Sequence, residues 1–334
     1  MLGRIRRMVA GAETASGTGA EPQLSIVVII YDMPAQAANT LESLTTGYQV
    51  GVDETDYEVI VVENGSANNL PAAVIDTLPG NFSYVLRKDA EPTPAHAINL
   101  GASRARGAHV CIMIDGARMV TPGLVRHLLL GHRLSAKAVV SVPGYHLGRE
   151  LQQEAVNSGY GLDEERELLR SIGWPADGYR LFDIACFSGS CAAGFFLPNS
   201  ESNCISMPRG IWDQLGGYDT RFDLRGGGFI NLDFYKRACE LPGVMHVIAL
   251  GEGTFHQFHG GVTTGGQAAE LREAYLESSK RQYRDLRGED FSPPRTRPTY
   301  LGELSVRVQP FIHRSSQNLV QSRAEPDAGA CRQC

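Results

Sequence analysis

Apolar and polar positions along the chain form blocks that predict strands separated by helices. Residues 24–30, 58–62 and 108–114 are apolar at nearly every position, which is typical of central strands covered on both faces of a sheet. Residues 82–86 and 138–142 are shorter runs of the same type. Segments with apolar residues at helical spacing separate these strands. The alternation predicts a parallel, doubly wound sheet with helices on both faces.

The second half of the chain carries a weaker pattern. Strands are expected at 203–207 and 244–250. Helical spacing recurs in four further segments, namely 150–171, 208–215, 232–238 and 267–287. Beyond Pro293 the chain is polar and rich in proline, and no core pattern predicts an element there.

Composition and charge narrow the class of protein. With 334 residues, of which 43% are hydrophobic and 20% charged, the chain can bury a sizeable core. A net charge of -6 argues against a nucleic-acid partner, because phosphate backbones are bound by clustered lysine and arginine. No apolar run approaches the roughly 20 residues of a membrane span. We therefore expect a cytoplasmic protein, whose basic start around Arg4, Arg6 and Arg7 makes at most a peripheral membrane contact.

The seven cysteines form an odd set that is scattered through predicted core elements. Cys111 and Cys204 fall in strands and Cys239 in a helix, a pattern that favours free thiols over a disulfide framework. Residues 331–334 have C-x-x-C spacing at the extreme end of the chain. With no helix after them, we expect a disordered tail there rather than a redox or metal site.

Carboxylates directly follow two of the predicted strands. Asp115 comes after the run 108–114, Glu63 comes after 58–62, and a glycine follows each acid closely. Ligands of open parallel sheets bind beyond the carboxyl ends of the strands, so both acids are expected at a binding edge. Two acids there suit a ribose or a cation better than a bare phosphate. The alternative for Asp115 is a helix cap before Thr121.

Two histidines three residues apart follow the last strong strand. His256 and His259 lie in a loop bounded by glycines. Imidazole is a common metal ligand and can also contact a diphosphate. Because no cysteine is near them, the spacing alone leaves a ligand pair and a structural pair equally open.

Four segments, in order, carry a resemblance to a known family. Residues 25–44 form a strand and helix that contain Thr-Leu-Glu-Ser-Leu, and 63–66 read Glu-Asn-Gly-Ser. Residues 97–108 contain Ala-Ile-Asn-Leu-Gly and Ala-Arg-Gly-Ala, and 215–222 read Leu-Gly-Gly-Tyr-Asp-Thr-Arg-Phe. Together they resemble the family 2 glycosyltransferases of the GT-A fold, whose corresponding segments are Asp-Asp-Gly-Ser, Ala-Arg-Asn-x-Gly with Ala-x-Gly, and Gly-Gly-Phe-Asp-Glu-Arg-Phe.

This resemblance covers about residues 24–260 and implies both a fold and a reaction. The fold is α/β, a nucleotide-sugar-binding GT-A type with a mainly parallel central sheet flanked by helices. The reaction is an inverting transfer of a sugar from a nucleoside diphosphate sugar, with a UDP-sugar expected first, to a glycan or small-molecule acceptor. Together with the pattern of elements, it divides the chain into a flexible leader 1–22, a domain 23–290 with a nucleotide-binding half 23–145 and an acceptor-binding half 146–290, and a partly disordered extension 291–334.

The resemblance also assigns roles to particular residues. The donor is expected to contact Asp32, Glu63, Asn99, Asp115 and Arg118. A divalent cation, Mn2+ or Mg2+, is expected on Asp115, His256 and His259, where it would face the diphosphate. In the alternative, Arg118 supplies the positive charge and no metal is needed.

Two departures from the family pattern affect these roles. The family's Asp-x-Asp is here Asp115-Gly116-Ala117, so the second acid is missing. The family's Glu-Asp, which supplies the general base, aligns with Ile230-Asn231, and an asparagine cannot accept the proton. Asp233 is the acid that remains, and we expect it to act as the base; the alternative is an aspartate favoured by the helix dipole in a first turn.

Two other classes of function compete with the enzyme. The missing acids would also fit a non-catalytic GT-A-like module that binds a nucleotide sugar or glycan, because fold alone does not determine function. A Rossmann-type oxidoreductase is disfavoured, since no G-x-G-x-x-G follows the first strand.

Overall fold

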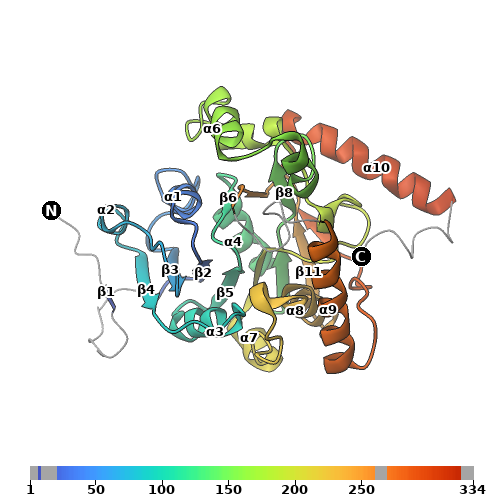
Figure 1. Ribbon diagram of the computed structural model, residues 1–334, viewed down its shortest axis with the longest axis horizontal. Coiled ribbons are helices and arrows are strands. Elements are labelled where there is room, and N and C mark those ends of the chain that lie inside the picture. Colours follow the sequence, from blue (N-terminus) through green and yellow to red (C-terminus); the bar gives the residue numbers. More distant parts are fainter. Residues whose placement is uncertain (1–6, 9–20, 260–268, 325–334) are drawn as a thin grey trace.

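The computed structural model describes residues 7–8, 21–259 and 269–324 (Figure 1). In this part of the chain the main sheet has nine strands. Their spatial order is β1 (Arg7–Met8), β4 (Phe82–Arg87), β3 (Tyr57–Asn64), β2 (Leu24–Ile30), β5 (His109–Met113), β10 (Cys204–Pro208), β7 (Ala138–Ser141), β11 (Met245–Ala249) and β13 (Thr299–Leu301).

The continuous apolar runs form the central strands, as predicted. β2 is parallel to β3 on one side and to β5 on the other, with Val27 opposite both Ile60 and Ile112. Every residue of β2 and β3 is buried, which is the reason for the absence of alternation in their sequences. The carboxyl ends of these parallel strands meet at one side of the sheet, which we call the carboxyl edge.

One strand of the main sheet runs against the others. β10 is antiparallel to both β5 and β7, and it lies between them. Strands β7, β11 and β13 are parallel to one another beyond it. The predicted class, α/β with a mainly parallel sheet, is confirmed, but an apolar run alone does not tell the direction of its strand.

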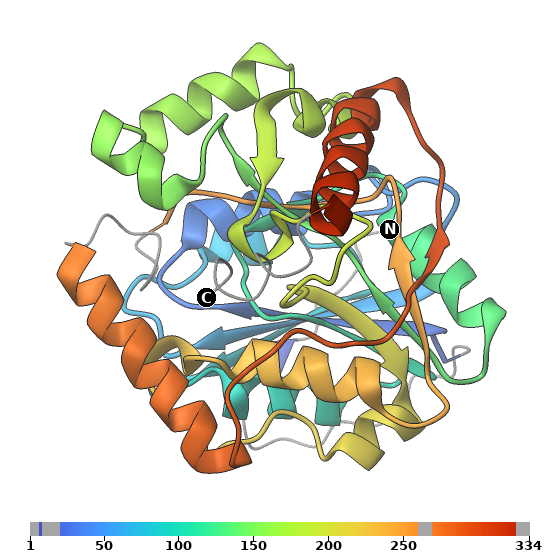
Figure 2. The same cartoon turned by 90° about the vertical axis from the view of Figure 1, so that its right-hand side faces the viewer.

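Helices cover both faces of the main sheet. One face packs against α3 (Ala95–Arg104), α7 (Arg209–Leu215), α8 (Ile230–Glu240) and α9 (Ala269–Arg287), which occupy the lower half of the molecule in Figures 1 and 2. The other face packs against α1 (Pro34–Glu42), α2 (Ala72–Ile75) and α4 (Leu124–Leu134). Pro34 begins α1, a position where its fixed φ suits the helix and its missing N–H costs nothing.

Two glycines allow neighbouring segments to approach β2 closely. A Cβ on Gly101, in α3, would lie 2.3 Å from the Val27 side chain of β2. A Cβ on Gly116 would lie 2.8 Å from the carbonyl oxygen of Ile29. The glycine after Asp115 therefore lets the end of β5 turn against the end of β2.

A smaller sheet and an aromatic core lie on the side of α6 (Leu162–Ser171) and α10 (Gln309–Ala324), which Figure 1 shows at the top. The strands of this sheet are, in spatial order, β6 (Arg118–Val120), β12 (Thr254–His256), β8 (Gly144–Leu147) and β9 (Ala185–Phe187). Between β8 and β9 the chain forms α5 (Gln152–Ala155), η1 (Val156–Ser158), α6 and η2 (Gly178–Ile184), and η3 (Gly189–Cys191) follows β9. Tyr145 is the centre of the core, with Phe187 and Phe255 stacked on it and Phe311 at its edge.

The C-terminal segment contains elements that the hydrophobic pattern does not predict. β13 extends the main sheet beside β11, and η5 (Val306–Val308) leads into α10. Near the other end of the chain, β1 falls within the predicted leader and pairs with β4. The domain boundaries themselves stay a prediction. The C-x-x-C at 331–334 lies outside the described residues, as do Arg4 and Arg6.

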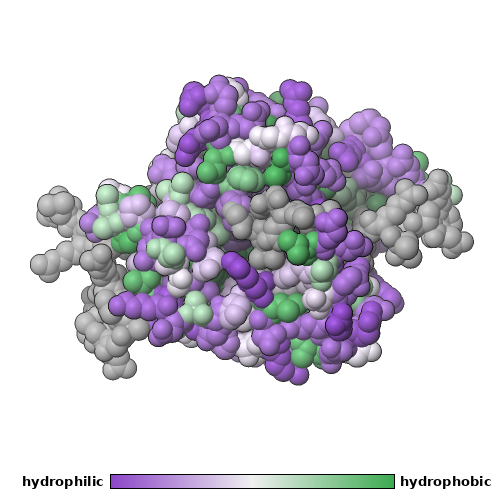
Figure 3. All heavy atoms as spheres, in the orientation of Figure 1, coloured by the Kyte–Doolittle hydropathy of each residue, from purple (hydrophilic) through white to green (hydrophobic). Residues whose placement is uncertain are grey.

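Thiols, surface and helix lengths complete the fold. The five cysteines among the described residues are free, in agreement with the predicted set of free thiols. The face shown in Figure 3 is mainly hydrophilic, with small separate apolar patches.

Among residues 7–8, 21–259 and 269–324, no helix combines the length and the hydropathy that crossing a membrane requires. The cytoplasmic location stays a prediction.

Candidate functional site

Three of the predicted ligand residues converge at the carboxyl edge. The Nε2 atom of His256 lies 3.1 Å from Oδ2 of Asp115 and 3.0 Å from Nε2 of His259. Nε2 of His259 lies 3.7 Å from the other carboxylate oxygen. One atom from each residue can be chosen so that all three lie within 4.8 Å of one another.

The two sheets bring these residues together. Asp115 lies two residues beyond β5 of the main sheet, and His256 is the last residue of β12 in the smaller sheet. Within the smaller sheet His256 is directly opposite Arg118 on one side and His146 on the other. The junction of the sheets thus places an acid, an arginine and imidazoles side by side.

Gln152 fixes the tautomer of His256. The Gln152 amide nitrogen donates to the backbone carbonyl of His256 at 2.9 Å, so its carbonyl oxygen Oε1 faces the ring nitrogen Nδ1, with which it forms a short hydrogen bond. A carbonyl can only accept, and therefore Nδ1 carries the hydrogen. In the neutral ring Nε2 then has a free lone pair, which points toward Asp115 and His259.

Burial keeps the imidazole neutral. Burial lowers the pKa of His256 to about 4, although the Asp115 carboxylate acts in the opposite direction. Burial also acts to raise the pKa of Asp115, but the two histidines, wherever they carry the shared proton, outweigh it and hold that pKa well below its ordinary value. An ionised carboxylate and a ring lone pair at contact distance repel each other unless a proton or a cation lies between them. This donor set fits a divalent cation that accepts oxygen and nitrogen ligands.

The turn that carries the histidines is held from three directions. The amide group of Gln257 pairs with α1, donating to the Gln36 carbonyl and accepting from Asn39. Its backbone N–H donates to the Ala117 carbonyl at 2.8 Å. On the other side, the backbone N–H of Phe258 donates to a carboxylate of α6, Glu165, at 2.6 Å. The ligand atoms are therefore preorganised.

Arg118 is the buried cation of the site. Its side chain is 8% exposed, and its Nε lies 3.5 Å from Oδ2 of Asp115. Within the described part of the chain, Nε and Nη1 have no hydrogen-bond acceptor. Guanidinium nitrogens form planar, forked contacts with phosphate oxygens, so this side chain could hold an anion next to the cluster.

Asp32 and Glu63 organise a loop at the same carboxyl edge. Glu63 is fully buried; it accepts hydrogen bonds from the Ser66 hydroxyl and from the backbone N–H of Leu70. Asp32 is exposed and accepts from the backbone N–H of Asn68 at 2.8 Å. Glu63 thus holds the loop, while Asp32 keeps an oxygen available to a ligand.

The other two predicted residues lie elsewhere. The Asn99 amide pairs with the backbone of Tyr218, donating to its carbonyl and accepting from its N–H, both at 2.9 Å. Asp233 is 1% exposed and binds the guanidinium groups of Arg237, at 2.8 Å, and of Arg287. Among the described residues, neither contacts Asp115 or the histidines.

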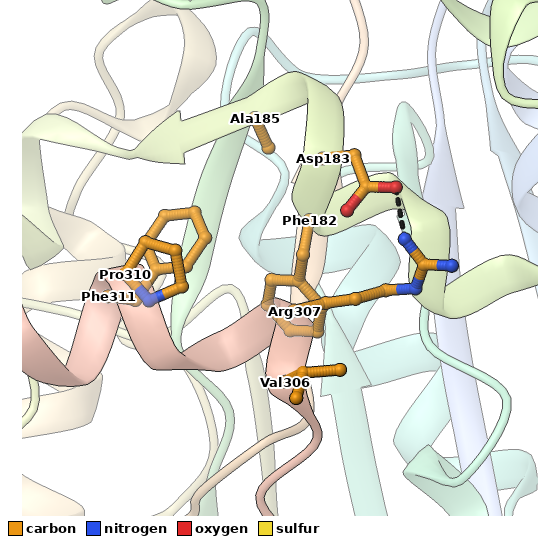
Figure 4. Close-up of a pocket in the computed structure, with 7 residues that line it drawn as sticks. All are labelled: Phe182, Asp183, Ala185, Val306, Arg307, Pro310 and Phe311. Atoms are coloured by element: carbon orange, nitrogen blue, oxygen red, sulfur yellow. Dashed lines mark hydrogen bonds and ion pairs between the residues drawn. The ribbon is translucent and has the colours of Figure 1, made fainter.

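A pocket on the smaller sheet's side contains none of these residues. It lies between η2 and the start of α10, and Figure 4 shows Arg307 reaching across to Asp183, with which it forms an ion pair. We therefore locate the candidate site by the convergence of Asp115, the two histidines and Arg118, and not by this pocket.

The sequence pattern did not identify two polar residues that support the site. Gln152 and Glu165 fall in the weak polar stretch 150–171, where nothing distinguishes them from solvent-exposed neighbours. Their roles depend on contacts with His256 and Phe258, about a hundred residues later in the chain. Only the spatial pairing reveals them.

Comparison with known proteins gives a family match and a distant structural likeness. The family described as Glycosyl transferase family 2 matches residues 25–196, just over half of the chain. Among solved structures, the chain is similar to the mannosyltransferase PcManGT from Pyrobaculum calidifontis in complex with GDP-Man and Mn2+. The identity is 15% and the TM-score 0.48, and the match covers 93% of this chain and 77% of that chain. No curated protein matches the chain.

Proposed function

The chain belongs to glycosyl transferase family 2, and from this premise we propose that it is an inverting glycosyltransferase acting on a nucleoside diphosphate sugar. The acceptor would be a hydroxyl group of a glycan or small molecule. The family match confirms the resemblance found in the sequence, and the mainly parallel sheet flanked by helices is the GT-A arrangement. The convergence of Asp115, His256 and His259 beside Arg118 carries the proposal to this site.

A divalent cation would be held by Asp115 and the two histidines. The anionic oxygen suits Mn2+ or Mg2+, the two imidazoles favour the transition metal Mn2+ of the two, and Gln152 presents the lone pair of His256 to the same point. When bound, the cation would offset the charge of the leaving diphosphate. The histidines would then compensate for the missing second acid of Asp-x-Asp.

Arg118 would act alongside the cation. Its unpartnered Nε and Nη1 would bind diphosphate oxygens, while Asp115 limits its movement. Asp32, on the loop at the same edge, would contact the nucleoside. Donor contacts by Glu63 and Asn99 stay predictions, because both side chains already hold backbone groups.

The non-catalytic alternative has one specific observation in its favour. Asn231 replaces the acid that the family uses as its base, and Asp233 nearby is enclosed by two arginines. A binding module would retain nucleotide-sugar affinity and release no nucleoside diphosphate.

Thermal melting and turnover together test the function. UDP-, GDP- and dTDP-sugars are added separately, each with Mn2+ or with EDTA, and a UDP-sugar is the first candidate. A ligand at 100 times its Kd should add about 2.7 kcal/mol to the free energy of unfolding. We expect one donor to stabilise the protein with Mn2+ and to release nucleoside diphosphate. Binding without release would favour the module, and a lack of binding by any donor would refute both.

Two variants separate the cation from the arginine. His256→Ala should abolish the Mn2+ dependence of donor binding, whereas Arg118→Lys should weaken donor binding at saturating Mn2+. His313→Ala, exposed on α10, is the control. Full turnover after exhaustive chelation, together with loss in Arg118→Lys, would assign the whole role to Arg118.

A further inference from the structure

Asn231, at the position where the family has its general base, is hydrogen-bonded to a carboxylate. Asn231 is 6% exposed, and its carbonyl oxygen accepts from the hydroxyl group of Tyr218 at 2.9 Å. Its amide nitrogen donates to Oε2 of Glu201 at 2.7 Å and to the Ser202 carbonyl at 3.2 Å. The amide is thus fixed in one orientation, with its N–H directed at Glu201.

Strand pairing places Glu201 at the carboxyl edge. β10 is antiparallel to β5, and its first residue, Cys204, is opposite Met113. The chain just before β10 therefore emerges where β5 ends, next to the segment that carries Asp115. Glu201 lies three residues before β10, and Asp115 lies two residues after Met113.

The surroundings of Glu201 leave its carboxylate available. It is partly exposed, and among the described residues Asn231 is its one hydrogen-bond donor and no cation pairs with it. Asp233 differs, since it is buried between two guanidinium groups whose hydrogen bonds occupy both its oxygens. A general base must have an oxygen within reach of the acceptor hydroxyl, and of these two carboxylates only Glu201 has an oxygen without a partner among the described residues.

We propose that Glu201 is the general base of the transfer and that Asn231 is its positioning residue; this rests on the proposed function. The acceptor hydroxyl oxygen bonds to the anomeric carbon while the bond from that carbon to the diphosphate oxygen breaks. The proton of the hydroxyl moves to Glu201, and the electron pair of the broken bond leaves with the nucleoside diphosphate. The catalytic carboxylate thus lies in the segment before β10 instead of on α8, and a single hydrogen bond joins it to Asn231 of that helix.

Exchanging the two side chains tests the assignment. Release of nucleoside diphosphate is measured from whichever UDP-, GDP- or dTDP-sugar stabilises the protein, with free glucose and mannose as acceptors. Glu201→Gln should lower kcat by about 10²–10⁴-fold, the usual contribution of a general base, and leave donor-induced stabilisation unchanged. The acidic limb of the pH profile should disappear with it. Adding Asn231→Asp should restore the carboxylate on the other side of the hydrogen bond and recover about tenfold or more of the lost kcat.

Controls separate this role from the wider function. Asp223→Asn, exposed and bonded to Gln282, should leave kcat unchanged. Melting of each variant without donor identifies any loss of folding. Wild-type kcat in a folded Glu201→Gln protein, or a lack of recovery in a folded double variant, would overturn Glu201 as the base while the function stands. A wild-type protein that turns over none of the donors would overturn the function and this role with it.

Discussion

Burial of Glu165 makes stability depend on pH. Burial raises the pKa of this carboxyl to about 7, even though the Phe258 N–H and the Tyr160 hydroxyl act to lower it. Between the ordinary pKa of about 4.5 and 7 the folded state holds a proton that the unfolded state has lost. The free energy of unfolding should therefore fall as pH rises through that range, by on the order of 3 kcal/mol.

Urea denaturation at pH 5 and pH 8 checks this expectation. In Glu165→Gln the side chain stays neutral, so this pH-dependent loss should be absent and the variant should gain on the wild type as pH rises. Glu164→Gln, exposed on the same helix, is the control, and its difference from the wild type should not change with pH. A constant difference for Glu165→Gln as well would contradict the assigned pKa.

Individual residues of the site were predictable only where strand ends expose them. Asp115 could be found because an apolar run stops at a carboxylate, and His256 and His259 because they follow the last strong strand. Gln152 and Glu201 carry no such signal, since each acts through a partner far away in sequence. Their roles follow from register and hydrogen bonding, which a single sequence does not contain.

At the scale of elements, Asp233 connects α8 with α9. Its carboxylate binds Arg237 of its own helix and Arg287 of α9, and Arg237 in turn donates to the carbonyls of Leu215 and Gly217. Asp233→Asn should destabilise the protein by less than about 3–5 kcal/mol. That range is the cost of leaving a fully buried charge unpaired, and the two guanidinium groups here keep some contact with water. Denaturant unfolding measures this change.

Turnover of the same variant distinguishes structure from catalysis. If the ion pairs are structural, kcat per folded molecule should be unchanged in Asp233→Asn. A selective loss of kcat by about 10²-fold or more would instead identify Asp233 as the base that the sequence predicts. Asp290→Asn, which removes an exposed ion pair with Arg284, should change stability by less than about 1 kcal/mol.

Elements were predictable where burial makes the pattern continuous. β2, β3 and β5 were read correctly because both of their faces are covered. The hydrophobic pattern did not predict β13 and α10, because their exposed residues outnumber their buried ones. The direction of β10 also escaped, since hydrophobic content is the same for a parallel and an antiparallel strand.

At the scale of the whole molecule, the last helix should contribute to the global stability. Phe311 of α10 contacts Tyr145 and Phe187, with ring centroids 5.0 Å apart in each pair. Phe311→Ala should lower the free energy of unfolding by about 3–5 kcal/mol, as expected for a buried aromatic side chain. Val320→Ala, at a residue 68% exposed on the same helix, should stay within about 0.5 kcal/mol. Equal effects in thermal unfolding would mean that α10 is not part of the cooperative core.

The position of β10 sets the order in which the chain can complete its fold. β10 is the bridge between the strands up to β5 and the group that begins with β7, although it follows β7 by about sixty residues in the sequence. On the ribosome β5 and β7 emerge first, and their facing edges stay unpaired until Cys204–Pro208 is synthesised. We therefore expect refolding to be limited by the insertion of this one strand, and fragments that end before it to aggregate through their open edges.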